Sequence, residues 1–158
     1  MGYEGLVTYE IFEESVNSVF YKGILENDVI PFFMKRKNID FIFQHDGAPA
    51  HSSHINIGLL NKFLNNRWIG KDSSLTEWPP KSPDLTVCDY FLWGYLKDKV
   101  YSHILANLND LRFAINEEIT KIPLEMIRKS VDNIEKRCKK CLKYNGDHFE
   151  MFLDRECD

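Results

Sequence analysis

The stretch FQHDGAPAH (43–51) closes an apolar run, IDFIFQ (39–44), whose composition is typical of a buried β-strand. Asp46 follows directly where this predicted strand ends. Pro49 suits the first turn of a helix that we expect over roughly 50–66. In open α/β sheets, ligands and catalytic groups collect where strands end. The sequence therefore predicts a carboxylate at the rim of a sheet.

The rest of the chain surrounds this unit with strands and helices. GLVTYEIF (5–12) has strand-forming residues. The apolar spacing over 16–34 predicts a helix, with a kink or an end at Pro31 as alternatives to a continuous one. A short strand is expected around 75–78. Three helices then follow, over 85–99, after the N-cap candidate Asn107, and from Pro123 to a stop at Asn145-Gly146. This order predicts an α/β fold with a helical C-terminal end and parallel pairing of the first two strands.

The composition is that of one soluble domain. The chain has 158 residues, of which 44% are hydrophobic and 28% charged, and its net charge of −4 argues against a general polyanion binder. We expect no membrane span and no signal peptide. Four cysteines without secretory context indicate reduced thiols in an intracellular protein.

Two carboxylates are candidates for chemistry. Asp46 stands at the predicted strand end, and Asp89 lies about one turn into the helix that follows SPDL. Carboxylates brought together from such elements hold Mg²⁺ or Mn²⁺, which prefer oxygen ligands. Two such ions support phosphodiester cleavage and transfer. Taken alone, a turn or helix-cap role is the favoured interpretation of Asp46, and a solvated first turn that of Asp89.

A second motif narrows these alternatives. FQHDGAPAH, followed by WPPKSPDLTVCDYFLWGYLKDKVY (78–101), resembles the catalytic domain of the mariner-like transposases of the DDE/D superfamily. The resemblance extends over about 3–152, which we take as a partial catalytic domain (1–152) with a tail (153–158). It implies an N-terminally truncated RNase H-like fold, metal-dependent DNA cleavage and strand transfer, transposon-end and target DNA as partners, and a nuclear location.

The resemblance also assigns site residues. Asp46 corresponds to the second acid of the family triad and Asp89 to the third, so both are expected to be catalytic and to bind Mg²⁺ or Mn²⁺. Asp84 is expected to cap the helix that carries Asp89. Val87 stands where the family usually has proline.

The sequence departs from the family at the first acid. No acid before Asp46 matches the motif that carries it, so we expect that this chain alone neither cuts nor joins DNA. The alternative function is a non-catalytic module that binds DNA or a protein. Without the strand that carries the first acid, the central strand would expose an edge, which predicts self-association into a homo-oligomer.

Other features have competing interpretations. Cys138 and Cys141, with His148 nearby, permit a zinc site, but their place on one helix favours core or free thiols. His51 and His54 permit another, although a hydrogen-bonding role is favoured. The basic residues of 128–143 either face DNA phosphates or form a solvated helix face. Aromatic residues between Trp68 and Tyr95 are expected to pack in the core rather than to stack on bases.

Overall fold

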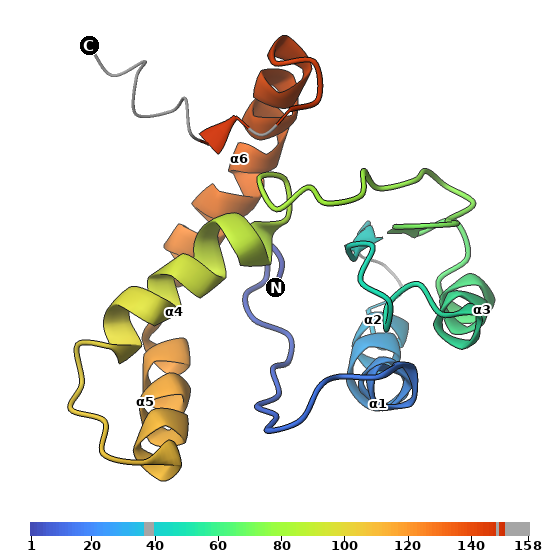
Figure 1. Cartoon of the computed structure of the whole chain (residues 1–158). Coiled ribbons are helices and arrows are strands. Elements are labelled where there is room, and N and C mark those ends of the chain that lie inside the picture. Colours follow the sequence, from blue (N-terminus) through green and yellow to red (C-terminus); the bar gives the residue numbers. More distant parts are fainter. Residues whose placement is uncertain (37–39, 148, 151–158) are drawn as a thin grey trace. The chain divides into compact units, whose positions relative to one another are not determined.

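The computed structural model describes residues 1–36, 40–147 and 149–150 (Figure 1). It divides into two units, and each is described by itself. One unit is Val7–Ser82, and the other joins Met1–Leu6 to Pro83–Asp158. The expected tail (153–158) lies outside the described residues, so the division into 1–152 and 153–158 stays a prediction.

The first unit opens with the helix predicted over 16–34. It runs without a break through α1 (Ser18–Ile24), the π-helical η1 (Leu25–Val29) and α2 (Ile30–Met34). Asn17 caps it, because its side chain accepts hydrogen bonds from the backbone N–H groups of Val19 and Phe20. Pro31 does not end the helix. Proline has no N–H to donate to the preceding turn, and the turn before it is widened, with Ile30 N–H bonded to Leu25 O.

The sheet of this unit has two strands. β1 (Phe43–Gln44) pairs in parallel with β2 (Trp68–Ile69), so that Phe43 lies opposite Trp68. Helix α3 (His54–Phe63) connects them. The strand predicted over 39–44 is confirmed at its end, whereas Ile39 lies outside the described residues. Ile42 is 58% exposed, so the prediction that this strand is buried throughout is wrong for that residue.

Two strand predictions are wrong for one physical reason: a strand needs a neighbour for its backbone hydrogen bonds. Residues 5–12 contribute no strand, only a bridge between Gly2 and Gly5, so the expected pairing of the first and second strands does not occur in the described residues. The segment around 75–78 forms a loop, in which Trp78 N–H bonds to Gly70 O. The partner of β1 is β2 instead.

The core of the first unit lies between its helices and β2. Its buried members are Tyr21, Leu25, Val29, Ile30, Ile57, Leu60, Leu64 and Trp68. Buried Asn56 ties the start of α1 to the turn before α3, because its Nδ2 donates to Ser18 O at 3.0 Å and to Ala50 O at 2.8 Å. This turn occupies residues that we predicted to be helical, and α3 begins four residues late, after Ser53.

The second unit is helical, as predicted for the C-terminal end. It contains η2 (Cys88–Leu92), α4 (Trp93–Val100), α5 (Leu108–Lys121) and α6 (Leu124–Lys143), and α4 packs against α5 (Figure 1). Asn107 caps α5 as predicted. After α6 the N–H of Gly146, at φ +89°, bonds to Cys141 O, which confirms the predicted stop. None of the described helices combines the length and apolar composition needed to cross a bilayer.

Candidate metal centre

Asp46 lies where β1 ends, as predicted, and two donors converge on one of its oxygens. His51 Nδ1 is 2.5 Å from Oδ1, and the backbone N–H of Ala48 donates to the same atom at 3.0 Å. The hydrogen bond from His51 and the one from Ala48 hold the pKa of the Asp46 carboxyl below its usual value, against the opposing effect of partial burial. The carboxylate is therefore ionised at neutral pH, and its side chain is 41% exposed.

The His51 ring packs in a small aromatic group beneath this turn. Its centroid is 4.1 Å from that of Tyr21, and it lies almost parallel to His45 at 5.4 Å. His45 is buried, and its Nδ1 is 3.3 Å from the Tyr21 hydroxyl. Burial, with His51 nearby, lowers the pKa of His45 to about 4. His45 is therefore neutral at pH 7, and the ring that packs against His51 carries no charge.

Asp89 lies in the other unit, in the first turn of η2. Its N–H donates to Thr86 O at 2.9 Å, and the residue is half-buried. In the structure each carboxylate thus lies on the kind of element that the sequence predicted, Asp46 after a strand and Asp89 near a helix start. Because they belong to different units, the structure describes each in its own surroundings.

The role predicted for Asp84 is wrong. Helix η2 begins after Val87 with no side-chain cap, and Asp84 is buried. Its Oδ2 accepts a hydrogen bond from the backbone N–H of Phe149 at 2.9 Å. The side chain thus holds the segment after α6 rather than the start of η2. Sequence spacing alone does not show this contact, because 65 residues separate its partners.

Arg137 is a structural residue that the sequence analysis missed. We counted it with the basic face of 128–143, but it is buried, donates to Asp84 O and to the Glu150 carboxylate, and lies 4.1 Å above the Tyr90 ring. A signal was present. Arg137 follows Ile134 by three residues and precedes Cys141 by four, a spacing that places it beside the apolar stripe of α6.

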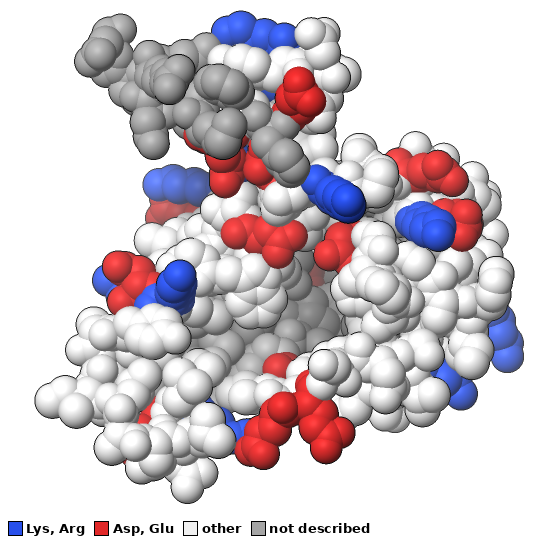
Figure 2. All heavy atoms as spheres, viewed as in Figure 1, with Lys and Arg blue, Asp and Glu red and all other residues white. Residues whose placement is uncertain are grey.

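The other basic residues of this helix support the solvated interpretation more than a phosphate-binding one. Lys129 pairs with Glu125 at 3.0 Å, Lys139 pairs with Glu135 at 2.5 Å, and Arg128 donates to Tyr3 O. Such exposed pairs are worth little energy, but they offset the local charge. On the face shown in Figure 2, Lys and Arg side chains are interspersed with Asp and Glu, and neither sign forms a continuous field.

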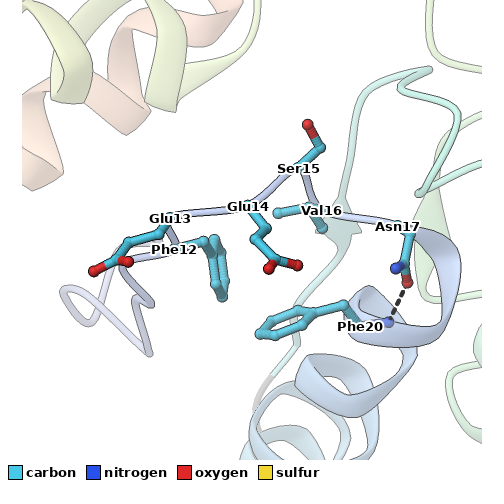
Figure 3. A pocket seen from close by; sticks show the side chains of 7 residues that line it. All are labelled: Phe12, Glu13, Glu14, Ser15, Val16, Asn17 and Phe20. Carbon is cyan, nitrogen blue, oxygen red and sulfur yellow. Dashed lines mark hydrogen bonds between the residues drawn. The ribbon is translucent and has the colours of Figure 1, made fainter.

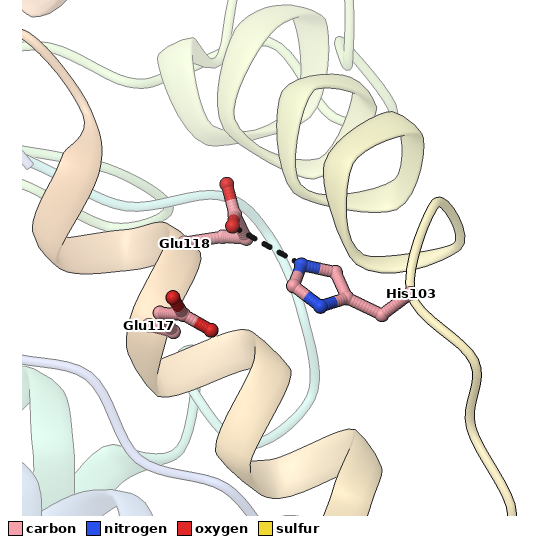
Figure 4. A group of neighbouring side chains, drawn as sticks. All are labelled: His103, Glu117 and Glu118. Carbon is pink, nitrogen blue, oxygen red and sulfur yellow. Dashed lines mark hydrogen bonds and ion pairs between the residues drawn. The ribbon is translucent and has the colours of Figure 1, made fainter.

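A second cluster of potential ligands lies between the end of α4 and α5 (Figure 4). Ligand atoms of His103, Glu117 and Glu118 lie within 4.8 Å of one another, and His103 Nε2 is 3.1 Å from Glu118 Oε1. Lys121 Nζ contacts Glu117 at 2.7 Å and Glu118 at 2.9 Å. The ammonium group supplies the positive charge that these carboxylates need. We therefore interpret the cluster as an ion-pair network that joins the α4–α5 connection to α5.

The two predicted zinc alternatives gain no support from the described residues. There, the cluster of His103 is the only group of three or more His, Cys, Asp or Glu with ligand spacing. Cys138 and Cys141 are free thiols, burial raises the pKa of Cys138, and His148 lies outside the described part. His51 bonds to Asp46, which agrees with the hydrogen-bonding role that we favoured.

The first unit has a hollow of about 200 Å³ before α1 (Figure 3). Its lining contains Phe12, Glu13, Glu14, Ser15, Val16, Asn17 and Phe20. The Phe12 and Phe20 rings meet edge to face at 4.4 Å, and the side-chain oxygen of Asn17 is already used as the cap of α1. Two acids beside apolar rings do not make a metal centre, and we assign the hollow no role.

Comparison with known proteins agrees with the motif resemblance. No family model matches the chain. The chain is 29% identical over 128 residues to the transposase of the transposable element Tc1 of Caenorhabditis elegans. It is 25% identical over 140 residues to the transposase of the element Tc3 of the same organism. These alignments cover 80% and 87% of the chain, which spans about two fifths of each relative, 43% and 40%.

Solved structures share the fold. The Mos1 mariner paired-end complex with Mg matches at a TM-score of 0.77 and 25% identity, over 94% of this chain and 42% of that one. The catalytic domain of the Mos1 mariner transposase matches at 0.72, over 94% and 72% respectively. The fold is therefore the RNase H-like fold of a transposase catalytic domain, present here in part.

Proposed function

We propose that this chain, which is homologous to the Tc1/mariner transposases by sequence and by fold, contributes Asp46 and Asp89 to a divalent-metal site for DNA cleavage and strand transfer. The observation that carries the proposal is the ionisation, exposure and position of the Asp46 carboxylate. An ionised, partly exposed carboxylate stands at the end of β1, at the position that the motif assigns to a metal-binding acid.

The residues suit Mg²⁺ or Mn²⁺, which bind carboxylate oxygens and retain several waters. Oδ2 of Asp46 accepts no hydrogen bond from the described residues, so one oxygen remains to bind a cation. When bound, such ions activate an attacking water or hydroxyl and stabilise the leaving oxygen. The contribution of the protein is to keep Asp46 deprotonated and oriented at the end of β1, and to present Asp89 on the first turn of η2.

We further propose that these 158 residues alone neither cut nor join DNA. The acids before Asp46 match no part of the motif that carries the first acid of the family triad. A site with two carboxylates holds a hard cation more weakly than a site with three, because each anionic ligand adds to the affinity. Binding to DNA, self-association and a nuclear location are part of the same proposal.

Calorimetric titration with Mn²⁺ tests the metal site. We expect weak binding by the wild-type chain that Asp46→Asn and Asp89→Asn each reduce further. Asp98→Asn is the matched control, because Asp98 is an acid of α4 whose side chain is 81% exposed. Equal binding by all four proteins would contradict the metal site.

A nicking assay with Mg²⁺ or Mn²⁺ tests the expected inactivity. Nicking that Asp46→Asn abolishes would show that the chain is active alone. DNA binding that none of these substitutions alters and that needs no metal would instead favour the alternative function, a non-catalytic binding module.

A further inference from the structure

We propose that His51 is a positioning residue for Asp46: its Nδ1–H fixes one carboxylate oxygen and leaves the other, Oδ2, directed to a divalent cation. This inference rests on the proposed function of Asp46 as a metal ligand and adds a residue to that site. His51 itself would not touch the cation.

The contact between the two side chains is short and its direction is determined by charge. Nδ1 of His51 is 2.5 Å from Oδ1 of Asp46. An ionised carboxylate only accepts hydrogen bonds, so Nδ1 carries the proton and donates it. Hydrogen bonds to a charged acceptor are shorter and stronger than neutral ones. The carboxylate is therefore held by a charge-assisted bond from the turn that follows it.

Both donors act on the same oxygen. The N–H of Ala48 reaches Oδ1 at 3.0 Å, and Oδ2 receives no hydrogen bond from the described residues. Two donors on Oδ1 fix the rotation of the carboxylate plane, because rotation would break both bonds. A carboxylate that is fixed before the cation arrives loses little conformational freedom on binding.

His51 is itself held in place. Its ring packs on Tyr21 at a centroid distance of 4.1 Å and lies parallel to His45 at an interplanar angle of 8°. The turn that carries it is tied down, because buried Asn56 donates to Ala50 O. The donor thus belongs to a packed group rather than to a loose side chain, and packing of this kind keeps a side chain in one orientation.

Two substitutions separate the hydrogen bond from the packing. His51→Phe keeps an aromatic ring against Tyr21 but has no donor. His51→Asn loses the ring but places an amide nitrogen near the position of Nδ1. Removing a residue that orients a metal ligand typically reduces metal affinity about 10- to 100-fold. We therefore expect Mn²⁺ to bind about tenfold or more weakly to His51→Phe, and His51→Asn to recover most of the loss.

The measurement is Mn²⁺ titration at pH 7.5, with thermal unfolding of each variant to show that it is folded. If Asp46→Asn weakens binding but His51→Phe matches the wild type, this inference fails and the proposed metal site stands. If His51→Phe loses affinity and His51→Asn restores none of it, the ring and not the donor matters, and the inference fails again. Absence of any dependence on Asp46 would overturn both proposals.

A readout without metal completes the test. Nitrogen-15 NMR of the histidine rings distinguishes the two neutral tautomers. We expect the proton of His51 on Nδ1 in the wild-type chain, and a changed Nδ1 resonance in Asp46→Asn, where the charged acceptor is lost. A His51 ring protonated only on Nε2 would overturn the inference whatever the metal titration shows.

Discussion

The backbone N–H of Phe149 donates a hydrogen bond to the buried Oδ2 of Asp84 at 2.9 Å. Arg137 joins the same contact, because it donates to the carbonyl oxygen of Asp84 and lies over the Phe149 ring at 5.2 Å. Three distant parts of the second unit thus meet at one aspartate. Asp84, the single acid of the SPDL motif, is therefore a structural residue, and it lies five residues before the proposed metal ligand Asp89.

Asp84→Ala should destabilise the second unit without direct loss of a metal ligand. Its removal leaves the buried N–H of Phe149 without its acceptor, which costs about 1–3 kcal/mol. Asp84→Asn should cost less, since an amide oxygen still accepts from Phe149. Urea unfolding measures both, and Asp98→Ala, at an exposed site, is the control. Equal stabilities for Asp84→Ala and Asp98→Ala would contradict the structural role.

Gly70 should not tolerate a side chain. A Cβ at this position would lie 2.5 Å from Nε2 of buried His45 and 3.1 Å from Cζ3 of Trp68, which is fully buried. Overpacking of this kind costs about 1–3 kcal/mol. The control is Gly58→Ala inside α3, where a Cβ meets nothing within 4 Å.

The two alanine substitutions should therefore change the free energy of unfolding in opposite directions. Alanine is favoured over glycine in a helix by about 1 kcal/mol, so Gly58→Ala should stabilise the chain and Gly70→Ala should destabilise it. Chemical denaturation of both variants provides the comparison. A Gly70→Ala protein as stable as the wild type would show that the His45 ring moves away without cost.

Stability should fall as the pH is lowered from 6.5 to 4. The pKa of His45 is lowered by burial from 6.5 to about 4, so the unfolded chain binds a proton in this interval that the folded chain does not. The contribution is complete above pH 6.5 and is lost as the pH falls toward 4, by an amount on the order of 3 kcal/mol. The contribution of Asp46 to stability is lost at lower pH, because the pKa of its carboxyl is depressed from 3.8.

Unfolding free energies measured at pH 7 and at pH 4.5 provide the test. His45→Phe retains a ring beside Trp68 but does not titrate, so the difference between the two pH values should shrink in this variant. The comparison uses the change with pH, because the loss of the Tyr21 contact lowers the stability of His45→Phe at every pH. An unchanged difference would assign the pH dependence to other groups.

The helices were predictable because their signals are local. Apolar spacing and the Asn107 cap predict α5, and the stop at Gly146 predicts the end of α6. The strands were less predictable, because pairing depends on distant residues. β2 is only two residues long, and residues 5–12 have strand-forming side chains but no partner strand in the described part.

The features of the site also divide into those with local sequence signals and those that depend on how the chain folds. The motif placed Asp46 at a strand end and Asp89 in a first turn, and the structure agrees in each unit. A hydrogen-bonding role for His51 was predicted, but its bond to Asp46 was not, since that geometry depends on how the turn closes. The spacing of Arg137 places it beside the apolar stripe of α6, but its contact with Asp84, across 53 residues, does not show in the sequence.

The free edge of β1 should promote self-association. Phe43 and His45 direct their N–H groups to Arg67 O and Ile69 O, so the backbone of Gln44 faces the other edge, where no described strand pairs. Beside it, Ile42 is 58% exposed. Such an edge is a template for another chain, and a lysine there opposes pairing.

We expect light scattering to show dimers or larger species for the wild type and a shift toward monomer for Ile42→Lys. Ile55→Lys, at a similarly exposed site on α3, is the matched control and should leave the association unchanged. A wild-type chain that remains monomeric at high concentration, or equal effects of the two lysines, would contradict association through this edge.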